Sequence, residues 1–263
     1  MNPIVAARRA AGALLARYYP RGLILYHLRT QSRNVEPELW LVPLLVGRGG
    51  AAVDVGANEG YWSLQMARYA GRVHAFEPNP ICLVQLKRVL PTRVKLHEVA
   101  LSDAVGTTSL RFDPGNTGIG TIEARNPLTG NAGIKHIETK DVVTKRLDDF
   151  EFNGVELIKI DVEGHEESVL RGAATTLERN RPTVICEIEE RHNPGGLARI
   201  RGAFEKLSYR SFALDGSRVR PLEAIEAEGR TKLGAAEGIN NFIFADGKKA
   251  QVLFSETSRP NER

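Results

Sequence analysis

Short apolar runs recur along the chain, and segments with apolar residues at helical spacing separate them. Runs that are apolar almost throughout are typical of strands covered on both faces of a sheet. The pattern predicts strands over residues 51–55, 72–76, 94–99, 155–160, 183–188, 209–214 and 241–245. It predicts helices over residues 61–69, from about 80, over 166–179 and over 197–207. This alternation predicts an α/β fold with a mostly parallel central sheet, closed by antiparallel pairing of the last strands.

The turn between the first strand and its helix carries the sequence DVGANEG at residues 54–60. Gly56 lets the backbone approach a ligand closely, and Gly60 lets the next helix pack tightly. The spacing D-x-G-x-x-x-G is not the G-x-G-x-x-G that binds a pyrophosphate. An acid at Asp54 instead favours a ligand with positive charge, and S-adenosylmethionine has both an ammonium and a sulfonium group.

The second predicted strand ends in Glu77, about 20 residues past the glycine loop. In α/β nucleotide-binding folds, a carboxylate at this place accepts hydrogen bonds from ribose hydroxyls. The alternative is that Glu77 only caps the helix that begins near Pro80, since acids favour helix N-termini.

The turn after the strand over 155–160 concentrates groups that can move a proton: Asp161, Glu163 and His165. Histidine titrates near neutral pH, so His165 is the first candidate for the base, ahead of Asp161 and Glu163. Capping or packing is the alternative role for His165. The acids Glu187, Glu189 and Glu190 follow the next strand and add candidates for binding acceptor hydroxyls.

Four sequence blocks, in order and over about residues 51–188, resemble the FkbM-type S-adenosylmethionine-dependent methyltransferases. The blocks are DVGANEG, AFEPNP at 75–80, ALSD at 100–103 and IKIDVEGHEESVLRGA at 158–173. The resemblance implies a Rossmann-like class I methyltransferase fold and transfer of a methyl group to an oxygen, often on a sugar or a natural product.

The same resemblance implies roles for individual residues. Ser102 and Asp103 would lie beside the adenine, and Asp161 would face both the methionine moiety and the acceptor. The implied cofactor-binding residues are Asp54, Gly56, Asn58, Gly60, Glu77, Ser102, Asp103 and Asp161.

The first 35 residues contain no acidic residue but six arginines: Arg8, Arg9, Arg17, Arg21, Arg29 and Arg33. Their apolar runs are too short to span a bilayer and show no secretory signal. One interpretation is a basic amphipathic surface for anionic lipid. The other is helices packed on the catalytic domain with their arginines outward.

The expected organisation is a basic helical extension over 1–48, a Rossmann-like domain over 49–247 and a polar tail over 248–263. An insertion over 107–146 interrupts the domain, with edge strands at 107–112 and 137–143. Its segment 113–133 is rich in Gly, Asn and Thr, and within it we expect residues 116–121 to be either an acceptor-gating loop or a surface excursion.

Charge and composition limit the classes of partner that we expect. A net charge of +4 without basic stripes does not indicate nucleic acid, and two cysteines fit a reduced, cytoplasmic protein. We expect a small-molecule or glycan acceptor, with polyketide-like and lipid-linked acceptors left open, and location in the cytoplasm, compatible with the inner face of the membrane. Homo-oligomers stay open.

Other classes of site and protein are disfavoured. A Mg²⁺ ion between Asp161 and Glu187, with His192 nearby, is conceivable, but no spacing requires it and no metal is predicted. A dehydrogenase should show G-x-G-x-x-G. A non-catalytic binding module would not need the acid- and His-rich turn. His27, His74, His97 and His136 are interpreted as structural or exposed.

Overall fold

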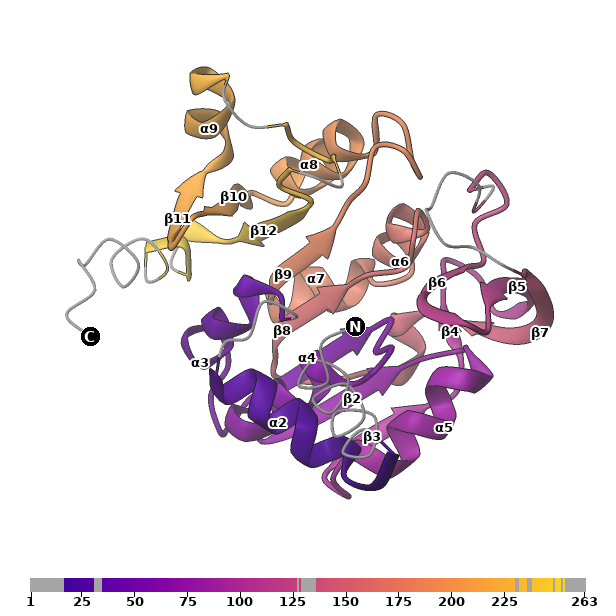
Figure 1. Cartoon of the computed structure of the whole chain (residues 1–263). Helices are drawn as coiled ribbons and strands as arrows, with labels where there is room; N and C mark the ends of the chain where they lie inside the picture. Colours follow the sequence, from indigo (N-terminus) through magenta and orange to yellow (C-terminus); the bar gives the residue numbers. More distant parts are fainter. Residues whose placement is uncertain are drawn as a thin grey trace, which may run out of the picture.

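The main body of the protein is an eight-stranded sheet with helices on both faces (Figure 1). The computed structural model describes residues 17–30, 35–126, 128, 136–229, 232–235, 238–247, 249–251 and 253. The sheet order is β11 (Arg218–Pro221), β10 (Arg210–Asp215), β12 (Asn241–Ala245), β9 (Thr183–Glu187), β8 (Val155–Ile160), β1 (Ala51–Val55), β2 (Arg72–Phe76) and β3 (Val94–His97). The strands from β9 to β3 run parallel, and β12 pairs antiparallel with β9 and β10. The predicted α/β class, the mostly parallel sheet and the antiparallel pairing of the last strands are confirmed.

The helices that cover the sheet are α4 (Tyr61–Tyr69), α5 (Pro80–Val89), α6 (Glu166–Arg171), α7 (Ala174–Asn180), α8 (Gly196–Lys206) and α9 (Leu222–Glu228). The predicted continuous helix over 166–179 is wrong, because it breaks between α6 and α7. A Cβ on Gly172 would lie 2.0 Å from the Ser102 carbonyl oxygen. This close backbone approach requires glycine at the position where the helix is interrupted.

The N-terminal segments pack against the same face of the sheet as α4. They comprise α2 (Pro20–Thr30), the 3₁₀-helix η1 (Pro37–Leu41) and α3 (Val42–Leu45). Ile24 and Leu28 of α2 are buried in the core, whereas Arg21 and Arg29 are exposed. These described residues have the arrangement of a packed helix with outward arginines. Arg8, Arg9 and Arg33 lie outside the described residues.

The insertion forms a second, four-stranded sheet at the right of Figure 1. Its order is β4 (Ala100–Leu101), β7 (Glu138–Lys145), β5 (Gly106–Asp113) and β6 (Asn116–Thr121), and η2 (Leu147–Phe150) follows it. The predicted edge strands therefore belong to a separate sheet. The prediction of a loop over 116–121 is wrong, because this segment pairs antiparallel with β5. Its alternating burial, with Ile119 and Thr121 buried, is typical of a strand with one covered face.

The C-terminal end of the described chain returns to the core. Ala250 and Leu253, inside the expected polar tail, are 3% and 0% exposed. Residues 254–263 lie outside the described residues. Among the residues that the structure describes, no helix has the length and apolar character needed to cross a bilayer.

Candidate active site

The glycine loop after β1 brings three strand ends together. Gly56 has a φ of +82°, and a Cβ there would lie 1.8 Å from the Asp161 carbonyl oxygen. Its N–H and that of Ala57 both donate to the Phe76 carbonyl, at 3.0 and 3.1 Å. Gly56 thus joins the ends of β1, β2 and β8. Gly60 was expected to allow close packing of the helix that follows it. In the structure, a Cβ at this residue would instead lie 3.1 Å from the Leu86 side chain of α5.

Glu77 lies at the end of β2 and is 5% exposed. Its two carboxylate oxygens accept the backbone N–H groups of Asn58 and Asn79, both at 2.8 Å. Burial raises the pKa of Glu77 to about 7 despite these bonds. The capping alternative is wrong, because the side chain of Asn79 caps α5 by accepting the N–H of Ile81.

Asp54 points away from the pocket. It is 1% exposed and accepts a hydrogen bond from the Ser63 hydroxyl of α4 at 2.5 Å. Its other oxygen, Oδ1, is buried without a hydrogen-bond partner among the described residues. Burial raises the pKa of this carboxyl to about 6. Asp54 adds negative charge beneath the site without lining it.

One pocket spans the strand ends and the insertion. It is lined from the main sheet by Val55, Gly56, Asn58, Phe76, Glu77, Pro78, Asn79, Val99, Asp161, Val162, Glu163 and His165, and from the smaller sheet and its flanks by Ala100, Leu101, Leu110, Thr117, Gly118, Gly120, Thr121 and Ile122. Strand β6, where a gating loop was expected, forms one wall. Six of the predicted site residues therefore line the pocket: Gly56, Asn58, Glu77, Asp161, Glu163 and His165. The other four do not line it: Asp54, Gly60, Ser102 and Asp103.

Ser102 and Asp103 make contacts outside the pocket lining. The Ser102 hydroxyl lies 2.9 Å from His165 Nε2, and Asp103 forms an ion pair with Arg171 at 2.9 Å. The hydrogen bond from Arg171 holds the pKa of Asp103 below its usual value. The neighbouring Ala100 and Leu101 line the pocket instead.

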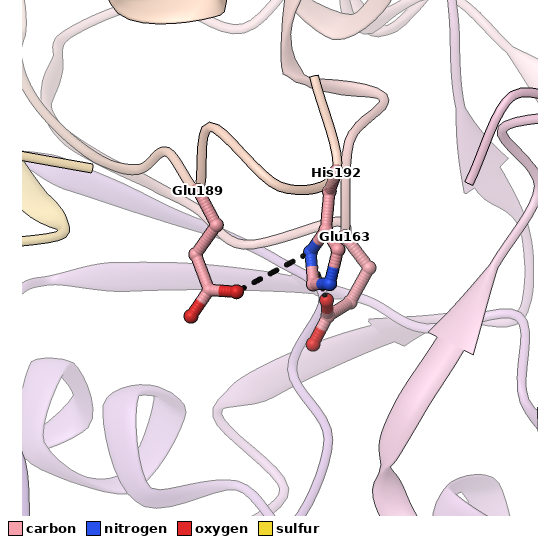
Figure 2. Close-up of side chains that lie close together, drawn as sticks. All are labelled: Glu163, Glu189 and His192. Carbon is pink, nitrogen blue, oxygen red and sulfur yellow. Dashed lines mark ion pairs between the residues drawn. The ribbon is translucent and has the colours of Figure 1, made fainter. Parts of the chain in front are cut away.

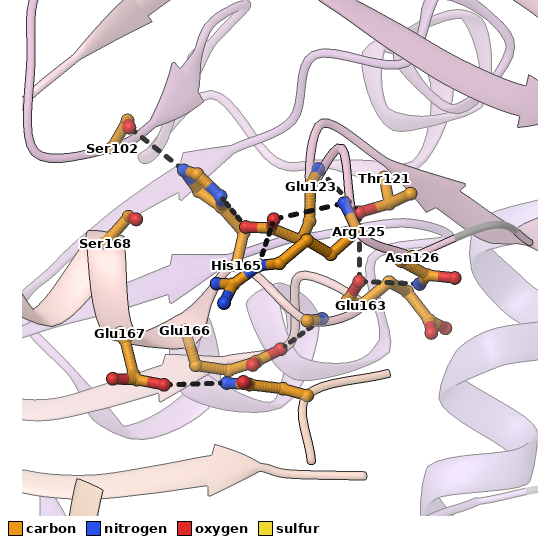
Figure 3. A network of polar contacts seen from close by, with 12 residues as sticks. Ser102, Thr121, Glu123, Arg125, Asn126, Glu163, His165, Glu166, Glu167 and Ser168 are labelled. Carbon is orange, nitrogen blue, oxygen red and sulfur yellow. Dashed lines mark hydrogen bonds and ion pairs between the residues drawn. The ribbon is translucent and has the colours of Figure 1, made fainter. Parts of the chain in front are cut away.

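His165 is engaged at both ring nitrogens (Figure 3). Nε2 contacts the Ser102 hydroxyl, and Nδ1 lies 3.2 Å from Glu123 Oε2 of the insertion. The residue occupies the N-cap position of α6 but makes no side-chain capping bond. The contacts favour the packing role: His165 connects the end of β4, the insertion and α6.

Glu163 attaches the insertion to the turn after β8. Its carbonyl oxygen accepts hydrogen bonds from Thr121 Oγ1 at 2.9 Å and Asn126 Nδ2 at 2.8 Å (Figure 3). Its carboxylate turns to His192, with Nδ1 at 2.8 Å. The backbone of Glu163 thus fixes the insertion over the pocket.

The described residues contain one group with the geometry of metal ligands: Glu163, Glu189 and His192 (Figure 2). His192 Nδ1 is already shared by the two carboxylates, at 2.8 and 3.5 Å, and Glu189 also pairs with Arg191. Since these contacts satisfy the group internally, we assign no metal to it.

Asp161 belongs to a buried charge cluster that the sequence analysis missed. Lys159 of β8 is 1% exposed, and its Nζ lies 3.9 Å from Asp161, 3.7 Å from Glu187 and 3.6 Å from Glu36. Burial raises the pKa of the Asp161 and Glu187 carboxyls, that of Glu187 further. Lys159 occupies the position imagined for Mg²⁺ beside Asp161 and Glu187. The signal for this cluster was Lys159 inside the apolar run over residues 157–160 of the predicted strand.

Comparison with known proteins identifies the family. Residues 54–211 match the methyltransferase FkbM domain, which is more than half of the chain. The protein belongs to the FkbM methyltransferase family. The resemblance inferred from the four sequence blocks is confirmed.

Individual relatives differ in how much of their sequence they share with this chain. The 2-O-methyltransferase NoeI of Sinorhizobium fredii is 27% identical over 78% of this chain and 90% of its own length. The methyltransferase sdnD of Sordaria araneosa is 34% identical over 46% of this chain, which spans only 59% of sdnD. The crystal structure of methyltransferase FkbM from Methylobacillus flagellatus KT superposes with a TM-score of 0.50 and 16% identity, over 75% of this chain and 44% of that one. This likeness supports the class I methyltransferase fold.

Proposed function

We propose that this FkbM-family protein is an S-adenosylmethionine-dependent O-methyltransferase that acts on a hydroxyl of a sugar or glycan. The observation that carries the proposal is one pocket shared by Gly56, Glu77 and Asp161, at the ends of three neighbouring strands. The chain adds strands in one direction from β1 to β3 and in the other direction from β8 to β9, so the order of strands reverses between β1 and β8. Open α/β sheets bind their ligands at such a point. The relative NoeI, named a 2-O-methyltransferase, supports oxygen as the accepting atom.

The residues of the pocket suit the proposed cofactor. Each oxygen of Glu77 accepts one backbone N–H, and a carboxylate oxygen has about two acceptor positions, so a vicinal diol can still bind. Phe76, Val99 and Leu101 offer apolar contacts for a base. The acid at Asp161 favours the cationic methionine end. When bound, the cofactor supplies a methyl group activated by the positive charge on sulfur.

Asp161 is the better candidate for the base. Its raised pKa makes it a stronger proton acceptor than an ordinary aspartate, and it lines the pocket. A base within hydrogen-bond reach of a hydroxyl contributes about 100- to 10,000-fold in rate. His165 would first have to release Ser102 or Glu123, so we place it among the residues that position the pocket wall.

The acceptor side of the pocket supports a hydroxyl-rich ligand. Thr117, Thr121, Asn58 and Asn79 contribute polar groups to the lining. Gly118 and Gly120 of β6 leave room opposite the two asparagines. A Cβ on Gly118 would lie 4.0 Å from Asn58 Nδ2, and a Cβ on Gly120 would lie 3.7 Å from Asn79 Nδ2. Such a polar, acid-containing wall favours a saccharide over a flat aromatic acceptor.

Cofactor choice is tested by thermal unfolding with S-adenosylmethionine or NAD. A ligand at about 100 times its Kd stabilises the folded state by ~2.7 kcal/mol, so we expect a higher melting temperature with S-adenosylmethionine only. Stabilisation by NAD instead would contradict the cofactor assignment.

Reaction and base are tested with methyl-labelled cofactor and panels of nucleotide sugars, glycolipids and small natural products. We expect label on a saccharide hydroxyl. Asp161→Asn should lower kcat at least about 100-fold, because the base is lost. His165→Gln should act mainly by weakening the pocket wall and should keep the pH dependence of kcat. A wild-type level of turnover for D161N would overturn the base assignment.

A further inference from the structure

Lys159 is a cation enclosed by the fold. Its side chain is 1% exposed, on the strand at the centre of the sheet, and Nζ donates to Asn241 Oδ1 at 3.0 Å. The Trp62 ring centroid lies 5.5 Å from the same nitrogen. A buried ammonium is costly unless it is hydrogen-bonded and paired with anions.

The anions come from three separate parts of the chain. Glu36, Glu187 and Asp161 lie 3.6, 3.7 and 3.9 Å from Nζ. Only Asp161 of these three lines the pocket. Lys159 therefore stands directly behind the carboxylate to which the proposed function gives the proton-accepting role.

Glu36 is held in place at both carboxylate oxygens. Oε1 accepts the indole N–H of Trp62 at 2.9 Å, and Oε2 accepts the Asn241 amide at 3.3 Å. Glu36 precedes the family match at 54–211, and Asn241 follows it. Segments from both flanks of the matched domain thus meet at Lys159.

We propose that Glu36 and Asn241 are positioning residues of the active site, which hold the Lys159 ammonium between Asp161 and Glu187 so that Asp161 faces the pocket as the proton acceptor. The inference rests on the proposed function. It makes the segment before the first strand part of the catalytic apparatus and not only a cover on the core.

The charged groups of this cluster shift the pKa of Asp161 in opposite directions. Burial raises its pKa most, Lys159 lowers it, and Glu163 and Glu36 raise it. Other ionisable groups that face Lys159 or Asp161 are Asp54 on β1, Glu77 after β2, Glu38 in η1, Glu166 in α6, and Cys186 and Glu187 on β9. Removing the charge of Glu36 must therefore shift the Asp161 titration downward, and removing that of Lys159 must shift it upward.

The test is the pH dependence of kcat/KM and of S-adenosylmethionine affinity for the full chain. For Glu36→Gln we expect the acid limb of activity to move to lower pH by roughly 0.5 to 1 unit, and for Lys159→Met to move to higher pH by at least as much. Asn241→Asp adds a negative charge beside Lys159 and should shift the limb upward too, which keeps the test decisive should K159M not fold.

Glu156→Gln is the matched control. Glu156 also attaches the N-terminal region to β8, by accepting the Gly47 N–H at 2.8 Å, but it has no contact with Lys159. We expect no shift of the limb for E156Q. Two outcomes would overturn the inference. One is an equal shift of the acid limb in E36Q and E156Q. The other is a shift in E36Q that does not have the opposite sign to the shifts in K159M and N241D. A wild-type protein that transfers no methyl group to any acceptor would instead reject the proposed function.

Discussion

At the scale of single residues, Glu77 combines a structural role with the ribose-binding role that we propose for it. Its carboxylate ties the glycine loop to the start of α5 through two backbone N–H groups. It is buried but lines the pocket. Burial keeps its pKa near 7, so a bound diol would complete the hydrogen bonds that favour the charged form.

We expect Glu77→Gln to lower the affinity for S-adenosylmethionine about 10- to 100-fold, since a hydrogen bond to a charged group contributes ~1.5–3 kcal/mol. Calorimetric titration measures this loss. Glu59→Gln is the control, because Glu59 belongs to the same loop but is exposed and does not line the pocket. Equal affinity of E77Q and wild type would contradict the ribose-binding role.

The residue scale also shows where sequence reasoning stops. Gly56, Glu77 and Asp161 were predictable because each follows a recognisable strand, and Asp54 because it lies near the end of one. Asp54 nevertheless turns under α4 to Ser63, since strand residues alternate between faces and its neighbours Val53 and Val55 take the other face. Which face a polar residue takes depends on packing that the local pattern does not specify.

At the scale of elements, β6 forms one wall of the candidate site. Its composition predicted a loop, but hydrogen bonds to β5 make it a strand. The pairing is local, because only Pro114 and Gly115 separate β5 from β6, but the Gly- and Thr-rich composition of the segment does not resemble that of a strand. The strand places Gly118 and Gly120 on the pocket wall, where a larger side chain would occupy the space offered to a ligand.

We expect Gly118→Val to leave the melting temperature unchanged or raised, because β-branched residues favour strands and the Cβ position has no contact under 3.5 Å. The same change should weaken binding of cofactor or acceptor at least about tenfold by filling the pocket, which corresponds to ~1.4 kcal/mol. Calorimetry and thermal unfolding separate the two effects.

Gly106→Val is the control for this substitution. Gly106 is exposed on β5 of the same sheet and does not line the pocket. Unimpaired binding in G118V, or the same loss in G106V, would show that the β6 wall does not limit the site.

At the scale of the whole molecule, buried carboxyls should make stability depend on pH. Burial raises the pKa of Glu77 and Glu166 to about 7, and that of Glu187 further. An unfolded glutamate titrates near about 4.3, so at neutral pH the folded state holds protons that the unfolded state has lost. This stabilisation is complete below the unfolded value and is lost as pH rises through the folded values.

We therefore expect the ligand-free protein to melt at a higher temperature at about pH 6.5 than at about pH 8.5, at constant ionic strength. His74 and His97 act in the opposite direction, because burial lowers the pKa of each to about 4. Their stabilisation is lost only as pH falls below about 6.5, outside the chosen window. A melting temperature that rises towards pH 8.5 would contradict the assignment of these carboxyls.

The whole fold was more predictable than the site. Nearly continuous apolar strands and the order of the four blocks determined the class, whereas the meeting of Glu36 and Asn241 at Lys159 depends on residues 205 positions apart. Such contacts follow from the packing of flanking segments on the sheet, and no local periodicity encodes them.

The smaller sheet leaves and rejoins the main body at one place. Ala100 and Leu101 of β4 pair with Thr144 and Lys145 of β7, and the Ser102 N–H donates to the Lys145 carbonyl at 2.9 Å. Because its two stems pair with each other, this excursion forms a unit beside the eight-stranded sheet, and Thr121, Glu123 and Asn126 attach it again at the turn after β8. Under the proposed function, substitutions in β6 of this unit would change the wall on the acceptor side of the pocket while Gly56 and Glu77 of the main sheet stay in place.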